Sequence, residues 1–374
     1  SNTVTLTTFV IDTTAPSAFT VGSVITSGGN VVANYLNGTN TTVTVTVPIE
    51  NDATLTGGTL QIQAKVTGQD FENIGSSATI LEGNLDGTQS IALTDDNIEA
   101  LTGYAEGTTV TFTAIITDTS SNSTTGTASG TTLAVDQTAP TIFYVTSTAN
   151  DGPYKADVTI PILILCNENL TVDTTGGTPT LTLETGASDV AVNYTSVSAS
   201  ALKFIYTVEA GHNSLDLDYK NSSALALNSG SVTDTAGNTL VVTLADPTET
   251  NSLSSSKDLV IDTTAPTLSE VTPVTTPDND NTPSYTFTTN ETGTLTTSIT
   301  EGFLGSASVN ITSTGNNSVT FAALGDGSYA GKTLTLTDAA GNATNLSITT
   351  FVIDTTSPSA FTVGSVITSG GNVV

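Results

Sequence analysis

A single phrase recurs four times along this chain: an apolar run, an Asp, two polar residues, a small residue and a Pro. The four copies occupy residues 9–16, 133–140, 259–266 and 351–358. Proline fixes its own φ and holds the preceding residue in an extended conformation. The phrase therefore predicts a short, stiff joint, and each interval between joints is long enough for one β-sandwich domain.

These joints divide the chain into five segments. We expect the last strand of a preceding domain at 1–12, immunoglobulin-like β-sandwich domains at 13–136, 137–262 and 263–354, and the first strand of the next repeat of domain one at 355–374. Residues 351–374 repeat residues 9–32 with a single difference, Ser357 in place of Ala15. Such near-identity indicates recent duplication, so we expect about one period of a longer array that continues beyond both ends. The predicted shape is an elongated rod.

Composition and local patterns predict an all-β protein. Thr, Ser, Val, Gly and Asn are prominent, while Met and Trp are absent, and such residues favour strands and turns. Apolar and polar residues alternate at 42–47, 109–114 and 333–337, as in half-buried strands. We expect the first of these strands to stop at Pro48. One helical turn is predicted at 95–101, and nothing else is predicted to be helical.

The charge of the chain limits its partners. It has 35 acidic residues against 6 basic ones, a formal net charge of −29. Such a chain repels phosphate backbones and anionic lipid surfaces, so nucleic acid and membrane are not expected partners. A solvated acidic surface accounts for most of this charge, and cation binding accounts for a share of it. No apolar stretch is long enough to span a bilayer.

The only cysteine, Cys166, lies in the apolar run 160–166. A single cysteine cannot form an internal disulfide, and in this context it is expected to be a small buried hydrophobic residue. The domains must therefore be stable without disulfide bonds.

A second motif, Asp-x-Ala-Gly-Asn, follows the linker phrase one domain later. It stands at 234–238 and 338–342, whereas domain one keeps only its Asp and Asn, at 118–122. Together the two motifs resemble the bacterial immunoglobulin-like (Big-type) repeats of giant surface adhesins. Domain three, through 281–287 and 290–293, is closest to that pattern, and domain two, through 180–186 and 215–219, is similar to another widespread surface-protein module. The resemblance implies a bacterial extracellular protein, secreted or attached to the cell surface.

Acidic side chains are expected to meet at each joint. In an immunoglobulin-like sandwich, the BC and FG loops gather at the end where the chain enters, and the linker Asp arrives there too. Each domain then offers a linker Asp, an acidic BC-loop residue and an Asp–Asn pair: Asp12, Glu50, Asp118 and Asn122; Asp136, Glu168, Asp234 and Asn238; and Asp262, Glu291, Asp338 and Asn342. Such oxygen donors suit Ca²⁺, and the absence of His and Cys argues against zinc or copper.

Turn chemistry alone is the alternative explanation of the same motif. Asp folds back on its own backbone, and Gly and Asn tolerate positive φ, so Asp-x-Ala-Gly-Asn also makes a good hairpin. Domain two is a better candidate for a bound ion than domain one, whose turn departs from the motif. A further acidic cluster at 278–281 is expected at the opposite end of domain three, where it serves the next joint or forms a solvated turn.

Catalysis has little support in the sequence, and we do not expect an enzyme. His212 is the only histidine, it is expected in an exposed turn, and no serine lies in a nucleophile motif. Neither a phosphate-binding loop nor a dinucleotide fingerprint is present.

Two hypotheses for function follow. The first is a stalk, in which neighbouring repeats of the same chain are the partners, with a variant in which copies bundle into a homo-oligomeric fibre. The second is an adhesive module whose loops bind a host, prey or surface ligand. Exposed aromatic clusters would favour the second hypothesis, but tyrosines such as Tyr35, Tyr104 and Tyr329 are scattered.

Overall fold

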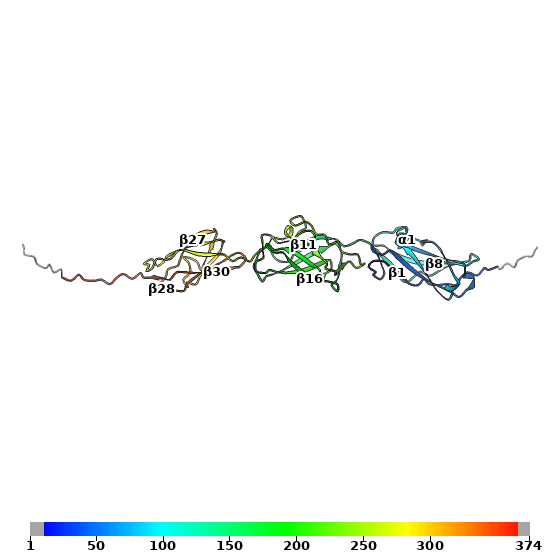
Figure 1. Cartoon of the computed structure of the whole chain (residues 1–374), viewed down its shortest axis with the longest axis horizontal. Coiled ribbons are helices and arrows are strands. Elements are labelled where there is room, and N and C mark those ends of the chain that lie inside the picture. The colour runs from blue at the N-terminus through cyan, green and yellow to red at the C-terminus, as the bar shows by residue number, and fades with distance from the viewer. Residues whose placement is uncertain (1–10, 366–374) are drawn as a thin grey trace, which may run out of the picture.

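The computed structural model describes residues 11–365 and consists of three β-sandwich domains arranged in a line (Figure 1). Each domain has its own hydrophobic core, built from residues 21–135, 145–261 and 274–353 respectively. The prediction of an all-β rod of tandem immunoglobulin-like sandwiches is therefore confirmed. The strand expected before the first joint involves residues 1–10, which lie outside the described residues, as do residues 366–374.

Domain one packs two sheets around alternating Val, Ile and Leu side chains. One sheet has the order β1-β3-β7, and the other has the order β2-β10-β8-β4-β5, with β6 on β4 and β9 on β8. The strands are β1 (Val24–Ser27), β2 (Tyr35–Asn37), β3 (Thr42–Ile49), β4 (Thr59–Val66), β5 (Glu72–Asn73), β6 (Ala78–Thr79), β7 (Gly87–Thr94), β8 (Thr109–Thr117), β9 (Ser123–Thr125) and β10 (Thr132–Asp136). Two 3₁₀ turns (Ala53–Leu55 and Glu82–Asn84) and the predicted helical turn, α1 (Asp95–Glu99), complete the domain.

The strand that was expected to stop at Pro48 continues to Ile49. Pro48 pairs with Thr88 of β7 in regular register, whereas β1 covers β3 only between Thr42 and Val45. The missing N–H of Pro48 therefore lies where the strand has one neighbour, and this is where a sheet tolerates proline. The prediction was wrong because it treated proline as a strand terminator without knowing which side of the strand was open.

Domain two has one seven-stranded sheet, in the order β11-β13-β17-β16-β15-β19 with β20 on β15, and two small sheets, β12-β22-β18 and β14-β21. Its strands are β11 (Ile142–Ser147), β12 (Gly152–Tyr154), β13 (Thr159–Cys166), β14 (Thr171–Asp173), β15 (Thr180–Glu184), β16 (Val190–Ser198), β17 (Ala201–Thr207), β18 (Asn213–Ser214), β19 (Asp218–Tyr219), β20 (Leu225–Ala226), β21 (Ser231–Thr233) and β22 (Leu259–Asp262). Cys166 is buried as predicted, with 2% of its surface exposed, and burial raises the pKa of its thiol to about 11.

Domain two also contains a helical turn that was not expected, α2 (Leu253–Ser256). The Ser252 hydroxyl accepts a hydrogen bond from the backbone N–H of Ser255 and caps the turn, while Leu253 is fully buried beneath it. One buried leucine in a serine-rich stretch has no helical periodicity, so tertiary packing decides this turn.

Domain three is built from β23-β24-β27, β26-β25-β29-β30 and the pair β28-β31. Its strands are β23 (Leu268–Thr272), β24 (Ser284–Thr289), β25 (Gly293–Thr297), β26 (Ser308–Ile311), β27 (Gly315–Thr320), β28 (Gly327–Tyr329), β29 (Thr333–Thr337), β30 (Ala343–Ser347) and β31 (Phe351–Ile353). The core has more aromatic residues than the other two, and the rings of Phe303, Phe321 and Phe351 stack in succession.

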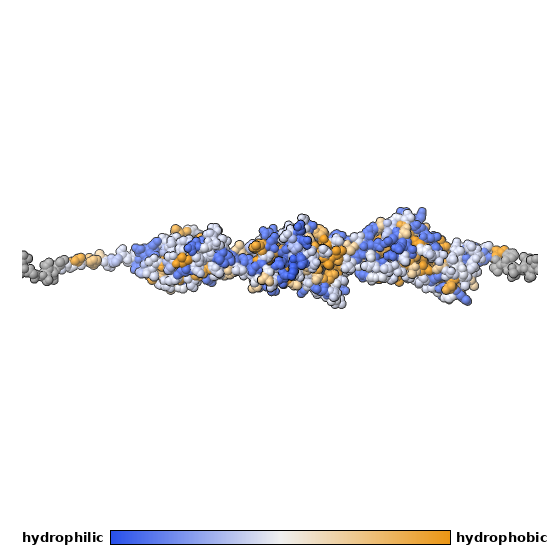
Figure 2. All heavy atoms as spheres, turned by 45° about the horizontal axis from the view of Figure 1, so that its top comes forward, coloured by the Kyte–Doolittle hydropathy of each residue, from blue (hydrophilic) through white to orange (hydrophobic). Residues whose placement is uncertain are grey.

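The last strand of each domain carries the chain into the joint. Asp136 ends β10 and Asp262 ends β22, while Asp354 directly follows β31. On the face shown in Figure 2, hydrophobic residues lie in small groups among hydrophilic ones. Among the described residues, no helix is long and apolar enough to cross a membrane.

Candidate metal centres at the domain joints

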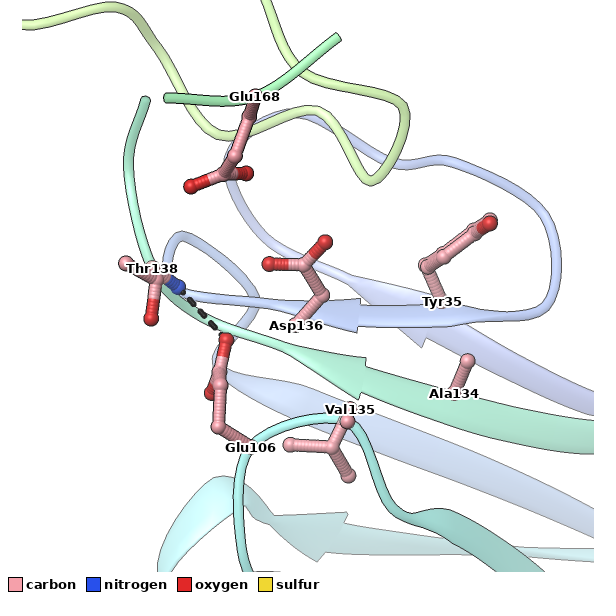
Figure 3. A pocket seen from close by; sticks show the side chains of 8 residues that line it. Tyr35, Glu106, Ala134, Val135, Asp136, Thr138 and Glu168 are labelled. Carbon is pink, nitrogen blue, oxygen red and sulfur yellow. Dashed lines mark hydrogen bonds between the residues drawn. The ribbon is translucent and has the colours of Figure 1, made fainter. Parts of the chain in front are cut away.

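Two of the joints bring three carboxylates together. The first triad is Asp136, Glu168 and Asp234, and the second is Asp262, Glu291 and Asp338; within each, the candidate ligand oxygens all lie within 4.8 Å of one another. In each triad one carboxylate belongs to the linker, one follows a long strand by two residues (β13 or β24), and one directly follows the strand before the turn (β21 or β29). Figure 3 shows the Asp136 and Glu168 carboxylates facing each other across the joint.

The Asn of each Asp-x-x-x-Asn turn holds the linker in place. The Asn238 side-chain amide donates to the backbone carbonyl of Asp136 and to Asp234 Oδ2, both at 2.8 Å. Asn342 makes the same pair of bonds to Asp262 and Asp338, both at 2.9 Å. Asn122 repeats them with Asp12 and Asp118, at 3.1 and 2.9 Å.

This geometry corrects the role expected for the three asparagines. Their amide oxygens were expected to serve as cation ligands, but their amide nitrogens point toward the linker and the turn Asp. The Asn238 oxygen is also engaged, because it accepts from the backbone N–H of Gly38 at 2.8 Å. In this geometry the three asparagines hold the linker through their amide nitrogens, and the oxygen of Asn238 already has a partner. Turn chemistry and a cation site thus use different atoms of one motif.

Burial and neighbouring charges raise the pKa of three triad carboxylates, those of Asp136, Glu168 and Glu291. Burial, followed by the charges of Asp234 and Glu168, raises the pKa of Asp136 to about 6. Burial also raises the pKa of Glu168, with the charge of Asp234 as the next cause. The pKa of Glu291 is raised by burial and then by Asp262 and Asp338. A cation among these oxygens would offset the charge repulsion, which is the second cause of these shifts after burial.

The first joint departs from this arrangement, although Asp12, Glu50 and Asp118 were expected to match the other two sets. Among residues 11–365, the acidic triads form only at the second and third joints. Glu50 instead accepts a hydrogen bond from the backbone N–H of Ser17 at 2.7 Å. Asn167 and Asn290 do the same for Thr141 and Thr267, both at 2.6 Å.

The reason for the mismatch is a register offset of one residue. Glu50 directly follows β3, just as Asn167 follows β13 and Asn290 follows β24. The counterpart of Glu168 and Glu291 is therefore Asn51, which is uncharged. Placing the end of β3 at Pro48 hid this offset. Domain one keeps the clamp of Asn122 on the linker but has one fewer carboxylate.

Sequence reasoning missed the oxygens that the preceding domain contributes. Each accepts a hydrogen bond from the backbone N–H of the residue after the linker Asp: Glu106 from Gln137 at 2.6 Å, Asn213 from Thr263 at 3.0 Å, and Asp326 from Thr355 at 2.9 Å. Glu106 and Asp326 lie in turns, whereas Asn213 begins β18. Figure 3 shows the further bond from the backbone N–H of Thr138 to Glu106, at 3.0 Å. The pairs Glu106-Gly107 and Asp326-Gly327 are a recognisable turn signal.

The acidic cluster at 278–281 lies beside the outgoing linker of domain three, as expected. Asp354 donates its backbone N–H to the carbonyl of Asp278 at 2.9 Å. The oxygens of Asp326 bind the next two linker residues, Thr355 and Thr356. The exit side of this joint is therefore built from the end of domain three.

The donors at the second and third joints could hold a metal ion, and their chemistry and spacing are compatible with Ca²⁺. All are oxygens, and a separation of up to 4.8 Å is what two ligands about 2.4 Å from a shared ion can reach. At the first joint, Asp12 Oδ2 is buried and has no hydrogen-bond partner among the described residues.

His212 is not the exposed turn residue that was expected. Its Nδ1 shares a hydrogen bond of 2.8 Å with the Tyr206 hydroxyl, and the two rings stack with centroids 5.9 Å apart. The histidine is half-buried, and its contacts are those of a packed side chain.

No protein-family model matches the sequence, and no curated protein matches it. The crystal structure of the chicken CNTN1 FN1–FN3 domains is similar over 88% of this chain and 98% of that chain, at 11% identity and a TM-score of 0.23. The crystal structure of dimeric latent PorU from Porphyromonas gingivalis is similar over 88% of this chain and 33% of that chain, at 12% identity and a TM-score of 0.18. Both TM-scores are too low for these likenesses to bear on function. The sheets themselves define the class: a tandem array of immunoglobulin-like β-sandwiches.

Proposed function

We propose that the chain is a stalk segment of a bacterial extracellular repeat protein, an adhesin or surface fibre, whose joints are stiffened by Ca²⁺. Three unlike sandwiches in a line, each with its own core, support a spacer role. The near-identical copies at 9–32 and 351–374 support a longer array of the same unit. Neighbouring repeats of the same chain are then its main partners.

One observation supports a role for calcium: each triad combines a carboxylate of the linker with two carboxylates of the domain that follows. Asp136 belongs to the linker, whereas Glu168 and Asp234 belong to the domain that follows. An ion bound by all three would fix the linker to domain two. Glu106, on the preceding domain, holds the next two linker residues by their backbone N–H groups. The bound ion would therefore restrict how domain two swivels relative to domain one, and Asp262, Glu291 and Asp338 would act in the same way for domain three.

The direct test is to compare the whole chain in calcium and in a chelator. At a free calcium concentration about 100 times the Kd, one site stabilises its domain by about 2.7 kcal/mol. For a domain of this size, that raises the melting temperature by roughly 10 °C. Calorimetry measures this shift, and small-angle X-ray scattering measures the length of the rod.

We expect chelation to lower the melting temperatures of domains two and three and to shorten the average end-to-end length. Domain one, which has no acidic triad among the described residues, should respond least. If chelation leaves both the melting temperatures and the rod length unchanged, the role of calcium is wrong, and the turn chemistry of the Asp-x-x-x-Asn motif is its only function.

A further inference from the structure

A loop of domain one directly contacts the turn of domain two, independently of the acidic triad. Three hydrogen bonds connect them: Asn30 Nδ2 to the carbonyl of Gly237 at 2.9 Å, Asn37 Nδ2 to the carbonyl of Ala236 at 2.7 Å, and the backbone N–H of Gly38 to Asn238 Oδ1 at 2.8 Å. We call residues 29–40 of domain one the latch loop. Each of the three residues of the Ala-Gly-Asn turn thus receives one hydrogen bond from it.

The latch loop is itself held rigid. Asn40 Oδ1 accepts from the backbone N–H of Asn37 at 2.9 Å, and Asn37 Oδ1 accepts from the backbone N–H of Thr39 at 2.9 Å. Asn37 is also paired with the linker, because β2 runs parallel to β10 with Asn37 opposite Asp136. Contacts within domain one and with the linker therefore fix the orientation of the Asn37 side-chain amide without any help from domain two.

The fit between the latch loop and the turn leaves no room for a side chain. Ala236 and Asn37 are completely buried, and Asn238 is 3% exposed. A Cβ added to Gly237 would lie 2.8 Å from Asn30 Nδ2 and 2.9 Å from Val32 Cγ2. The bond from Asn37 to Ala236 is buried, whereas those from Asn30 and Gly38 are partly buried; a hydrogen bond shielded from water is stronger than an exposed one.

The next joint has the same turn sequence but lacks this contact. Domain three presents Ala340-Gly341-Asn342, and these residues are only half-buried. Between the described parts of domains two and three, this turn receives one direct hydrogen bond, from Lys155 Nζ to the carbonyl of Gly341 at 3.1 Å. Lys155 follows Tyr154, which pairs with Ile261 in β22, so Lys155 takes the place that Asn37 has in domain one. A flexible, exposed lysine replaces a fixed amide.

We propose that the latch loop is a metal-independent socket for an Ala-Gly-Asn turn and joins domains one and two into a single rigid unit. Without a cation, flexibility is then concentrated at the joint between domains two and three. The socket also selects its partner. Domain one has Ser121 where domains two and three have glycine. Its turn therefore carries a side chain that a latch loop cannot accommodate. A domain of the first type thus cannot be joined in this rigid way to another domain of the first type that precedes it.

The test measures the spread of distances across each joint in the whole chain, in the presence of a chelator. Spin labels on introduced cysteines at Thr132 and Thr171 report on the first-to-second domain joint, and labels at Thr207 and Thr294 report on the next one. All four positions are exposed, and the buried Cys166 stays unlabelled. We expect pulsed dipolar EPR spectroscopy to find a narrow distance distribution for the first pair and a broad one for the second.

Two glycine substitutions form a matched pair. Gly237 and Gly341 occupy the same turn position with φ of +97° and +94°, so Gly237→Ala and Gly341→Ala introduce the same backbone strain. Only the first places a methyl group inside the latch loop, since the nearest neighbour of the second is the flexible end of Lys155, 3.5 Å away. Gly237→Ala should broaden the Thr132–Thr171 distribution to the width of the other pair, and Gly341→Ala should leave it narrow.

Asn30→Ala is a milder variant in case Gly237→Ala destabilises domain two. It removes the bond to Gly237 but keeps the backbone bonds of residue 30 to Thr39, Asn37 and Asn40, and it should broaden the same distribution. Equal widths at both joints in wild-type chain, or equal effects of the two glycine variants on the first joint, would overturn the proposal. Because every measurement is made in chelator, these outcomes are independent of whether the triads bind Ca²⁺.

Discussion

Glu168→Gln is predicted to change the stability of domain two in opposite directions with and without calcium. The substitution keeps the size of the side chain and removes one charge from the triad with Asp136 and Asp234. In a chelator the wild-type carboxylates repel one another, and after burial this repulsion is the next cause of the raised pKa values of Asp136 and Glu168. In calcium the same carboxylate is a ligand, so its loss weakens the site.

The magnitudes follow from the geometry. The triad oxygens lie within 4.8 Å of one another, and two unit charges at that upper limit repel by about 1 kcal/mol in water and by about 3.5 kcal/mol at an effective dielectric constant near 20. Since both groups are only half-buried, we expect Glu168→Gln to stabilise domain two in chelator by about 1 kcal/mol. If Kd rises about tenfold, calcium at 100 times the wild-type Kd stabilises the variant by about 1.4 kcal/mol instead of about 2.7 kcal/mol.

The assay is calorimetric melting of the whole chain at neutral pH, in calcium and in chelator. The variant should melt higher than wild type in chelator and show a smaller rise on adding calcium. Glu50→Gln is the matched control, because Glu50 lies outside the triads and binds the backbone of Ser17; its calcium response should equal that of wild type. A wild-type chain insensitive to calcium, or a Glu168→Gln chain with an undiminished calcium response, would refute the assignment of Glu168 as a ligand.

Three further predictions concern other groups. The pKa of Asp136 is raised from 3.8 to about 6, so the folded chain holds this proton more tightly than the unfolded chain. The free energy of unfolding in chelator should therefore fall as pH rises from about 4 to about 6. The calcium-induced rise in melting temperature should shrink below about pH 6, because the protonated carboxyl is no longer a free ligand. Asn342→Ala should cost domain three about 1–3 kcal/mol by urea unfolding, because Asp262 and Asp338 lose a donor, whereas Asn316→Ala on the exposed face of β27 should cost little. The Cys166 thiol should react with a disulfide reagent only on unfolding, because it is buried; equal rates in folded and unfolded chain would contradict this.

The strands and the joints could be read largely from local sequence. Alternation at 109–114 and 333–337 is the period of a half-buried strand, and both stretches lie in strands, β8 and β29. The helical turn at Asp95 and the burial of Cys166 were predictable for the same reason, since each depends on a few neighbouring residues. The linker phrase located the Asp residues that meet carboxylates at the second and third joints.

Features that depend on contacts between residues far apart in the sequence could not be predicted in this way. Pro48 continues a strand because β1 stops short of it, and this depends on a partner strand. Because β3 ends one residue later than expected, Glu50 accepts a hydrogen bond from a backbone N–H. Its expected equivalents, Glu168 and Glu291, belong to the triads instead. Glu106, in a turn, and Asn213, in the short strand β18, were missed because a single acidic or amide residue carries no local sign that a linker will pass beside it.

By itself, the sequence determined an array of β-sandwiches separated by stiff acidic linkers, because strand periodicity and proline restriction act over a few residues. Tertiary structure alone decided which joint is locked. The turns Ala236-Gly237-Asn238 and Ala340-Gly341-Asn342 are identical in sequence, yet one is enclosed by the latch loop and the other meets a single lysine. The difference comes from what the preceding domain places beside the turn: Asn30, Asn37 and Gly38 in one case, and Lys155 in the other. Only the folded chain brings those residues to the turn.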